Sequence, residues 1–164
     1  MAWFTKAMVL ILTLLSCCGW VGPMAAVAAD PKDMGGWERG GAYDRLYNPQ
    51  ERDKFKGTVV DVVEVVPMTG MSPGVALLVK DAEGDEVPVH LGPRWFVDPK
   101  SIGIKKGDRV TVKGVWVELD DRDLVMASKV SKGDTYEYKV RLTADGTPFW
   151  TMTPEQLAKE RAGD

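Results

Sequence analysis

The clearest structural signal in the chain is the stretch Arg109-Val-Thr-Val-Lys-Gly-Val-Trp-Val-Glu-Leu119. Valine recurs at every second position on either side of Gly114, and this alternation is typical of a half-buried β-strand. A glycine inside such a pattern indicates a bulge or a bend. The stretch therefore predicts one long strand that bends at Gly114.

Further strand patterns lie on both sides of this stretch, separated by turn signals at residues 82–85 and 120–123. They cover residues 55–66, 75–81, 86–91, 124–130 and 135–142. Several short strands with turns between them indicate an antiparallel barrel or sandwich. A long first strand, a meander, an insertion after the third strand and a closing hairpin favour the OB barrel over the immunoglobulin sandwich. We therefore predict an all-β fold, a small OB-like antiparallel barrel of five to six strands.

The predicted barrel spans residues 55–152 and has an extension at each end. Residues 30–54 are rich in glycine and charge and carry three aromatics, so we expect an extended arm that either docks on the barrel or tethers it flexibly. Residues 153–164 begin with Thr153-Pro-Glu-Gln156, a capping box with proline at the first helical position. This predicts a short C-terminal helix.

Residues 1–29 have the pattern of a secretory signal peptide. Lys6 precedes an apolar run, and small residues lead up to Ala29, after which cleavage is expected, with Ala28 as an alternative position. Two other readings remain open: Cys17 as the lipidated residue of a lipoprotein, or an uncleaved membrane anchor. All three place the remaining chain in the periplasm, either free or attached to the membrane.

Cleavage after Ala29 would leave 135 residues, enough for one domain with a core. Both cysteines would be removed, so the mature protein would have no disulfide, no thiolate metal site and no attached haem. The apolar run would be removed with them, so no membrane span is expected after cleavage. Its net charge would be −4, because Lys6 is the only charge lost from a chain of charge −3. An acidic chain is a poor ligand for nucleic acid, so we expect no nucleic-acid partner.

No catalytic motif stands out. The chain has one histidine, His90, and lacks the glycine-rich phosphate loops, paired-histidine zinc motifs and Gly-x-Ser-x-Gly turn of common enzymes. The acidic residues at 120–123 lack calcium-loop spacing and suit a solvated hairpin tip. We therefore predict that the protein is not an enzyme.

A candidate binding face is centred on His90. Val87, Val89 and Leu91 have the pattern of a core-facing set, so His90 should point to the outer face, opposite Leu77 if the hairpin closes at residues 82–85. OB folds bind ligands on this face. The residues predicted to converge there on a ligand or protein partner are Met68, Met71, His90, Arg94 and Trp95.

Three of these residues also form a candidate metal site. The thioethers of Met68 and Met71 and the imidazole of His90 are soft ligands that suit Cu(I). The alternative is that both methionines fill the barrel mouth and that His90 is an ordinary exposed strand residue.

Several motifs together resemble those of the MamS/MamX magnetosome protein family, small exported proteins. The motifs are Gly41–Pro49 leading into Phe55–Val59, Pro67–Val75, Val89–Phe96, Lys106–Gly114 and Ala144–Trp150. The resemblance implies a periplasmic or membrane-associated OB-like domain, and for the magnetosome members a link to iron handling and redox control. The chain departs from the family pattern in two ways: it lacks the Cys-x-x-Cys-His haem motif of the MamX branch, and it has Ala76 where members often carry histidine.

We therefore expect an exported, non-enzymatic binding or accessory module of the bacterial envelope. Its partner would be an envelope protein complex, such as one of electron-transfer proteins. One alternative is a periplasmic carrier of Cu(I) or iron, and another is an oligonucleotide-binding OB protein, which the charge and the export signal oppose.

Overall fold

The computed structural model describes residues 33–162, so the predicted signal peptide lies outside the described residues. The described chain contains six strands and four short helical segments. The strands are β1 (Arg52–Val65), β2 (Gly74–Lys80), β3 (Glu86–Pro93), β4 (Arg109–Leu119), β5 (Arg122–Lys132) and β6 (Tyr136–Lys139). The helical segments are η1 (Asp44–Leu46), η2 (Pro49–Glu51), η3 (Phe149–Thr151) and α1 (Pro154–Ala162).

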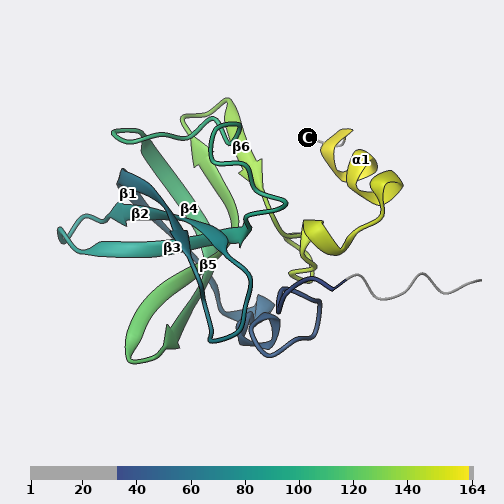
Figure 1. The fold of residues 1–164 in the computed structure, drawn as a ribbon. Helices are drawn as coiled ribbons and strands as arrows, with labels where there is room; N and C mark the ends of the chain where they lie inside the picture. The colour runs from purple at the N-terminus through teal and green to yellow at the C-terminus, as the bar shows by residue number, and fades with distance from the viewer. Residues whose placement is uncertain (1–32, 163–164) are drawn as a thin grey trace, which may run out of the picture. The chain divides into compact units, whose positions relative to one another are not determined.

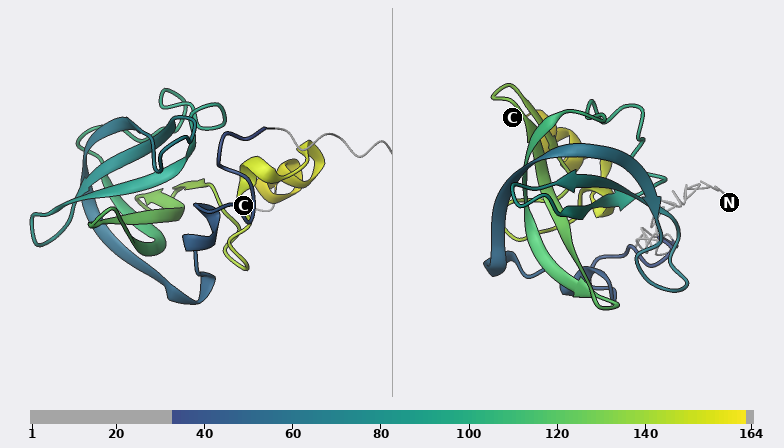
Figure 2. Two further views of the ribbon diagram at one scale, coloured as in Figure 1. Left: turned by 60° about the horizontal axis from the view of Figure 1, so that its bottom comes forward. Right: turned by 90° about the vertical axis from the view of Figure 1, so that its left-hand side faces the viewer.

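The strands form one sheet in the order β3-β2-β1-β4-β5-β6, with antiparallel neighbours. A short parallel pairing of β3 with β5 joins Val89 to Val125 and His90 to Met126. These pairings lead in a circuit from β1 through β2, β3, β5 and β4 back to β1, around which the long β1 curves (Figures 1 and 2). The all-β prediction is confirmed, with an OB-like strand order and a narrow junction between β3 and β5.

The barrel interior is filled by the alternating valines and leucines that mark the strands in the sequence. Val75, Leu77, Val79, Val89 and Val112 are each fully buried. The predicted irregularity at Gly114 is present, because the register between β4 and β5 shifts between Lys113 and Gly114. A Cβ at this glycine would lie 2.3 Å from the carbonyl oxygen of Met126, so close strand contact explains the residue.

The N-terminal arm differs from the extended segment that the sequence predicts. Strand β1 begins at Arg52, three residues before the predicted start, and the preceding residues form turns and the helices η1 and η2. Trp37 and Tyr43 are 1% and 2% exposed and belong to the hydrophobic core. Their rings lie edge to face at 5.1 Å, so the arm's aromatics form an integral layer of the domain.

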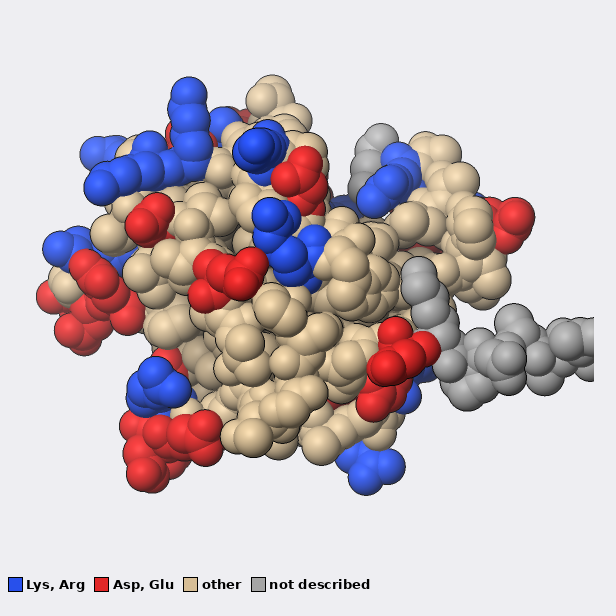
Figure 3. All heavy atoms as spheres, viewed as in Figure 1, with Lys and Arg blue, Asp and Glu red and all other residues tan. Residues whose placement is uncertain are grey.

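The C-terminal helix α1 begins as its capping box predicts. Gln156 N–H donates to the Thr153 hydroxyl at 3.2 Å, and the Gln156 side chain accepts from Thr153 N–H at 3.0 Å. Within the described residues, no helix has the length and apolar character needed to span a membrane. On the face shown in Figure 3, basic and acidic side chains occur beside one another.

Candidate functional site

His90 lies on the outer face of β3, but in a different register from the one predicted. It pairs with Ala76 of β2, whereas Leu77 pairs with Val89. The reason is a longer hairpin loop, in which the carboxylate of Asp81 accepts backbone N–H groups of Glu83, Gly84 and Asp85. Asp81 is therefore part of the loop and not of the strand. The β2–β3 pairs from this loop as far as His90 are shifted by one residue relative to the prediction.

The alternative in which His90 is an exposed strand residue is wrong. Its side chain is covered by Tyr43 of the arm, and the residue is only 7% exposed. The Tyr43 hydroxyl lies 2.8 Å from His90 Nδ1, and the two rings stack at 6.1 Å. An arm residue distant in the sequence therefore fixes the imidazole orientation.

Burial determines the charge and the tautomer of this pair. Desolvation, with a smaller effect from the Arg122 guanidinium, lowers the pKa of His90 to about 4, so the ring is neutral at pH 7. Desolvation also raises the pKa of Tyr43, which keeps its proton. Because this buried hydroxyl needs an acceptor, it donates to Nδ1, and the ring hydrogen of His90 then resides on Nε2.

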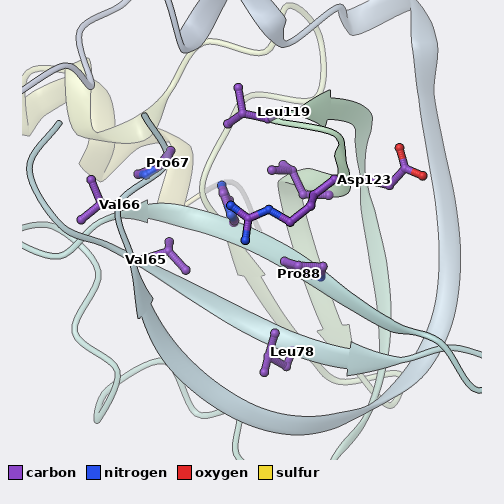
Figure 4. A pocket seen from close by; sticks show the side chains of 10 residues that line it. Val65, Val66, Pro67, Leu78, Pro88, Leu119 and Asp123 are labelled. Carbon is purple, nitrogen blue, oxygen red and sulfur yellow. The ribbon is translucent and has the colours of Figure 1, made fainter. Parts of the chain in front are cut away.

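A cavity of about 310 Å³ lies against His90 (Figure 4). Its floor is the outer face of β2 and β3, and its walls come from the end of β1, the residues that follow it, and the β4–β5 hairpin. The lining residues are Val65, Val66, Pro67, Leu78, Pro88, His90, Leu119, Arg122, Asp123 and Leu124. An apolar cavity with a few polar groups is the usual form of a small-ligand site.

The β4–β5 hairpin brings one cation to this cavity. Arg122 and Leu124 alternate with Asp123 along β5, so Asp123 projects to the opposite face of the strand. Its carboxylate points away from the other labelled side chains in Figure 4. Within the described part of the chain, Arg122 has no ion pair, and its charge is available to the cavity.

The hairpin that carries Arg122 has a constrained turn. Leu119 pairs with Arg122 across Asp120 and Asp121, which have φ angles of 52° and 57°. Aspartate tolerates this left-handed conformation better than most residues, and two such residues in succession suit a two-residue hairpin turn. The acidic cluster of the sequence is thus a turn that positions Leu119 and Arg122.

The predicted loop methionines line a second cavity. Met68 and Met71 are partly buried against the core and border a cavity of about 230 Å³ together with Tyr43 and Glu38. Tyr43 connects the two cavities, since it lines this one and its hydroxyl contacts His90.

The other two predicted residues lie outside both cavities. Arg94 forms an exposed ion pair with Glu64 at 3.4 Å. Trp95 is 44% exposed and packs edge to face on Phe96 at 6.4 Å. Of the five residues expected to converge, only His90 is among those that line the cavity of about 310 Å³.

Sequence reasoning did not identify Tyr43, Leu78, Arg122 and Leu124 as site residues. Leu78 could have been found, because strand alternation places it on the same face as His90 in the neighbouring strand. Arg122 could not, because the sequence predicts a turn at residues 120–123, whereas β5 begins at Arg122 and pairs with β3 only in the structure. Tyr43 left no such signal, because nothing in a non-periodic arm indicates which aromatic covers which strand.

The described residues contain no cluster of three or more His, Cys, Asp or Glu side chains able to hold a metal ion. Methionine thioethers are outside this set of ligands, so the site formed by Met68, Met71 and His90 stays a prediction.

Comparison with known proteins places the chain in a family. No curated protein matches it. The model of the MamS/MamX magnetosome protein family matches residues 51–137, more than half of the chain. The match includes every residue that lines the His90 cavity, whereas Tyr43 precedes it. The chain therefore belongs to the MamS/MamX magnetosome protein family.

Proposed function

We propose that this protein is an exported, non-enzymatic binding or accessory module of the bacterial envelope, and that the His90 cavity is its binding site. The observation that carries the proposal is an apolar cavity on the outer β2–β3 face into which an unpaired guanidinium and a buried imidazole project. OB-like domains use the same face for ligands, which supports the assignment.

The composition of the cavity supports binding rather than catalysis. Its lining includes no serine, threonine or cysteine, and so no hydroxyl or thiol nucleophile beside His90. The nearest hydroxyl is that of Tyr43, whose raised pKa makes it a weak nucleophile at neutral pH.

The binding proposal is tested by capture from periplasmic extract. Tagged wild type is compared with Leu78→Glu, which places a charge in the cavity at a half-buried position, and with Lys80→Glu. Lys80 lies two residues along the same face of β2 but borders a different cavity. Proteins and small molecules retained by wild type and by Lys80→Glu should be lost from Leu78→Glu; identical retention by all three would overturn the proposal.

The envelope location rests on the N-terminal sequence. We expect cleavage after Ala29, and the intact mass of the protein purified from cells decides between this product, a chain lipidated at Cys17 and an uncleaved chain. Recovery of the uncleaved chain from the cytoplasmic fraction would contradict export.

A second candidate function is a carrier of Cu(I) or iron. The observation that favours it is the cavity bordered by both Met68 and Met71, next to the tyrosine that contacts His90. Cu(I) titration against a competing chelator tests it, with the Met68→Leu, Met71→Leu double variant and His90→Gln as comparisons. Affinity weaker than micromolar, or unaffected by either variant, would reject it.

The third candidate, oligonucleotide binding, has the least support. Basic and acidic side chains are interspersed on the face in Figure 3, and phosphate binding needs clustered cations. A gel shift with single-stranded DNA at low salt should show no complex.

A further inference from the structure

We propose that the His90 cavity binds a small organic acid, with the carboxylate held by Arg122 and His90 Nε2–H and the apolar body packed on Leu78, Pro88 and Leu124. This inference rests on the proposed function above. It adds the chemical class of the ligand, which neither the family match nor the fold specifies.

The first argument is the charge of the cavity. Arg122 brings a guanidinium to the lining without an ion-pair partner among the described residues, and the adjacent Asp123 projects to the other face of β5. A guanidinium offers a planar pair of donors that matches a carboxylate. One cation favours a monoanion over a phosphate ester, which usually needs several.

The second argument is the buried histidine. His90 is 7% exposed, its Nδ1 is occupied by the Tyr43 hydroxyl, and it lines the cavity. The other ring nitrogen has no hydrogen-bond partner among the described side chains. Nε2 is not among the buried unpaired polar atoms of the described residues, so it is open to the cavity and can donate its hydrogen to a ligand oxygen.

The third argument is the shape and lining of the cavity. Apart from the charged residues and His90, its lining is proline, valine and leucine. Its volume of about 310 Å³ is at the small end of ligand sites, which suits a short aliphatic or aromatic body and excludes a dinucleotide.

Titration of ¹⁵N-labelled protein with hexanoate, hexanol and hexylammonium tests the ligand class. Hexanoate should bind most tightly and shift the amide signals of Leu78, His90 and Leu124. Equal binding of hexanol would show that the cavity binds apolar molecules but that the carboxylate inference is wrong. Tighter binding of hexylammonium would also overturn the inference, and no binding of any probe would count against the proposed function itself.

Two variants assign the anchoring groups. Arg122→Gln should weaken hexanoate at least about tenfold, the loss expected for one charge-assisted hydrogen bond, and leave hexanol unchanged. His90→Gln should weaken hexanoate less, because the amide of glutamine can replace one donor. The matched control is Arg109→Gln, which removes an arginine that borders a different cavity and should have no effect. An equal loss of hexanoate affinity in Arg122→Gln and Arg109→Gln would show that the net charge of the protein alone causes the loss, and would overturn the assignment.

The carboxylate could come from a free acid or from the C-terminus of a protein partner. A short peptide ending in leucine is therefore compared with its C-terminal amide. If the free-acid peptide binds more tightly than hexanoate and the amide does not bind, the ligand is a polypeptide terminus. If hexanoate binds and neither peptide does, it is a free acid. Equal binding of acid and amide would contradict the inference.

Discussion

At the scale of single residues, His90 and Tyr43 form the most consequential pair in the molecule. A strand histidine whose neighbours alternate with it would ordinarily face solvent, but here the arm covers it. The pair therefore links the stability of the arm to the chemistry of the cavity, and each partner yields a prediction.

The pH dependence of stability should reveal His90. Its pKa falls from 6.5 in the unfolded chain to about 4 in the fold, so between these values the unfolded state takes up a proton that the folded state does not. The contribution of His90 to the free energy of unfolding is fully present above pH 6.5. It decreases as the pH falls from 6.5 to 4, by about 1.4 kcal/mol per pH unit and by about 3 kcal/mol in all. Chemical denaturation at pH 7, 5.5 and 4 measures it.

His90→Gln is the control for that experiment. It cannot titrate in this range, whereas the carboxyls with lowered pKa, such as Asp108 and Glu137, are common to both proteins. The free energy of unfolding of wild type should therefore fall more steeply than that of the variant between pH 6.5 and 4. Parallel curves would mean that His90 is not held neutral.

Removal of the Tyr43 hydroxyl should destabilise the protein. Tyr43→Phe retains the ring contacts but leaves His90 Nδ1 buried without a donor, which costs about 1–3 kcal/mol. Tyr138→Phe is the matched control, because that half-buried hydroxyl makes no hydrogen bond within the described residues. Urea unfolding of the two variants should differ by most of this amount, and equal midpoints would contradict the role of the pair.

At the scale of secondary-structure elements, the bend in the β4–β5 ladder depends on Gly114. Gly114→Ala would place a methyl group 2.3 Å from the Met126 carbonyl oxygen, in backbone that cannot move without breaking the ladder. We expect a loss of about 1–3 kcal/mol, typical of overpacking. Lys113→Ala, one residue earlier and half-buried, should cost less; thermal unfolding compares them, and an unchanged Gly114→Ala would show that the strands have room.

The hairpin that follows shows how an element positions the site. Because Asp120 and Asp121 form the turn, Leu119 and Arg122 face each other directly and border the same cavity. A solvated acidic tip, as the sequence predicts, thus also sets where the arginine lies.

At the scale of the whole molecule, one buried ion pair joins the arm to the C-terminal part of the domain. Arg141 is 3% exposed, donates to Asp44 at 2.6 Å and to the carbonyl of Gly146 at 3.0 Å, and lies over the ring of Tyr47. Asp44 and Arg141 are 97 residues apart in the sequence. Arm and barrel should therefore unfold together.

Breaking this pair should be costly. Asp44→Ala leaves the Arg141 charge buried without its partner, with an expected loss of about 3–5 kcal/mol. Arg39→Ala removes the exposed pair with Asp145, in which the side chains are 63% and 54% exposed, and should cost less than about 1 kcal/mol. Guanidinium unfolding followed by tryptophan fluorescence measures both; a small effect of Asp44→Ala would mean that the arm is only weakly coupled to the barrel.

Local patterns in the sequence predict the number and order of the strands, the irregularity at Gly114 and the capped C-terminal helix, although β1 begins three residues earlier than predicted. These follow from alternation and from residues such as Thr153 and Gln156, whose effects act over a few neighbouring positions. His90 could be assigned to the outer face of β3 for the same reason.

What covers that face follows from the packing of distant segments, which no local pattern reports. The burial of His90 by Tyr43, the approach of Arg122 and the separation of Met68 and Met71 from the His90 cavity depend on contacts between distant segments. The carboxylate of Asp81 also moved the β2–β3 register by one residue, a choice between two loops that the turn residues alone do not make. Periodicity reports which face a side chain takes, but the partner on that face is set by how the whole chain packs.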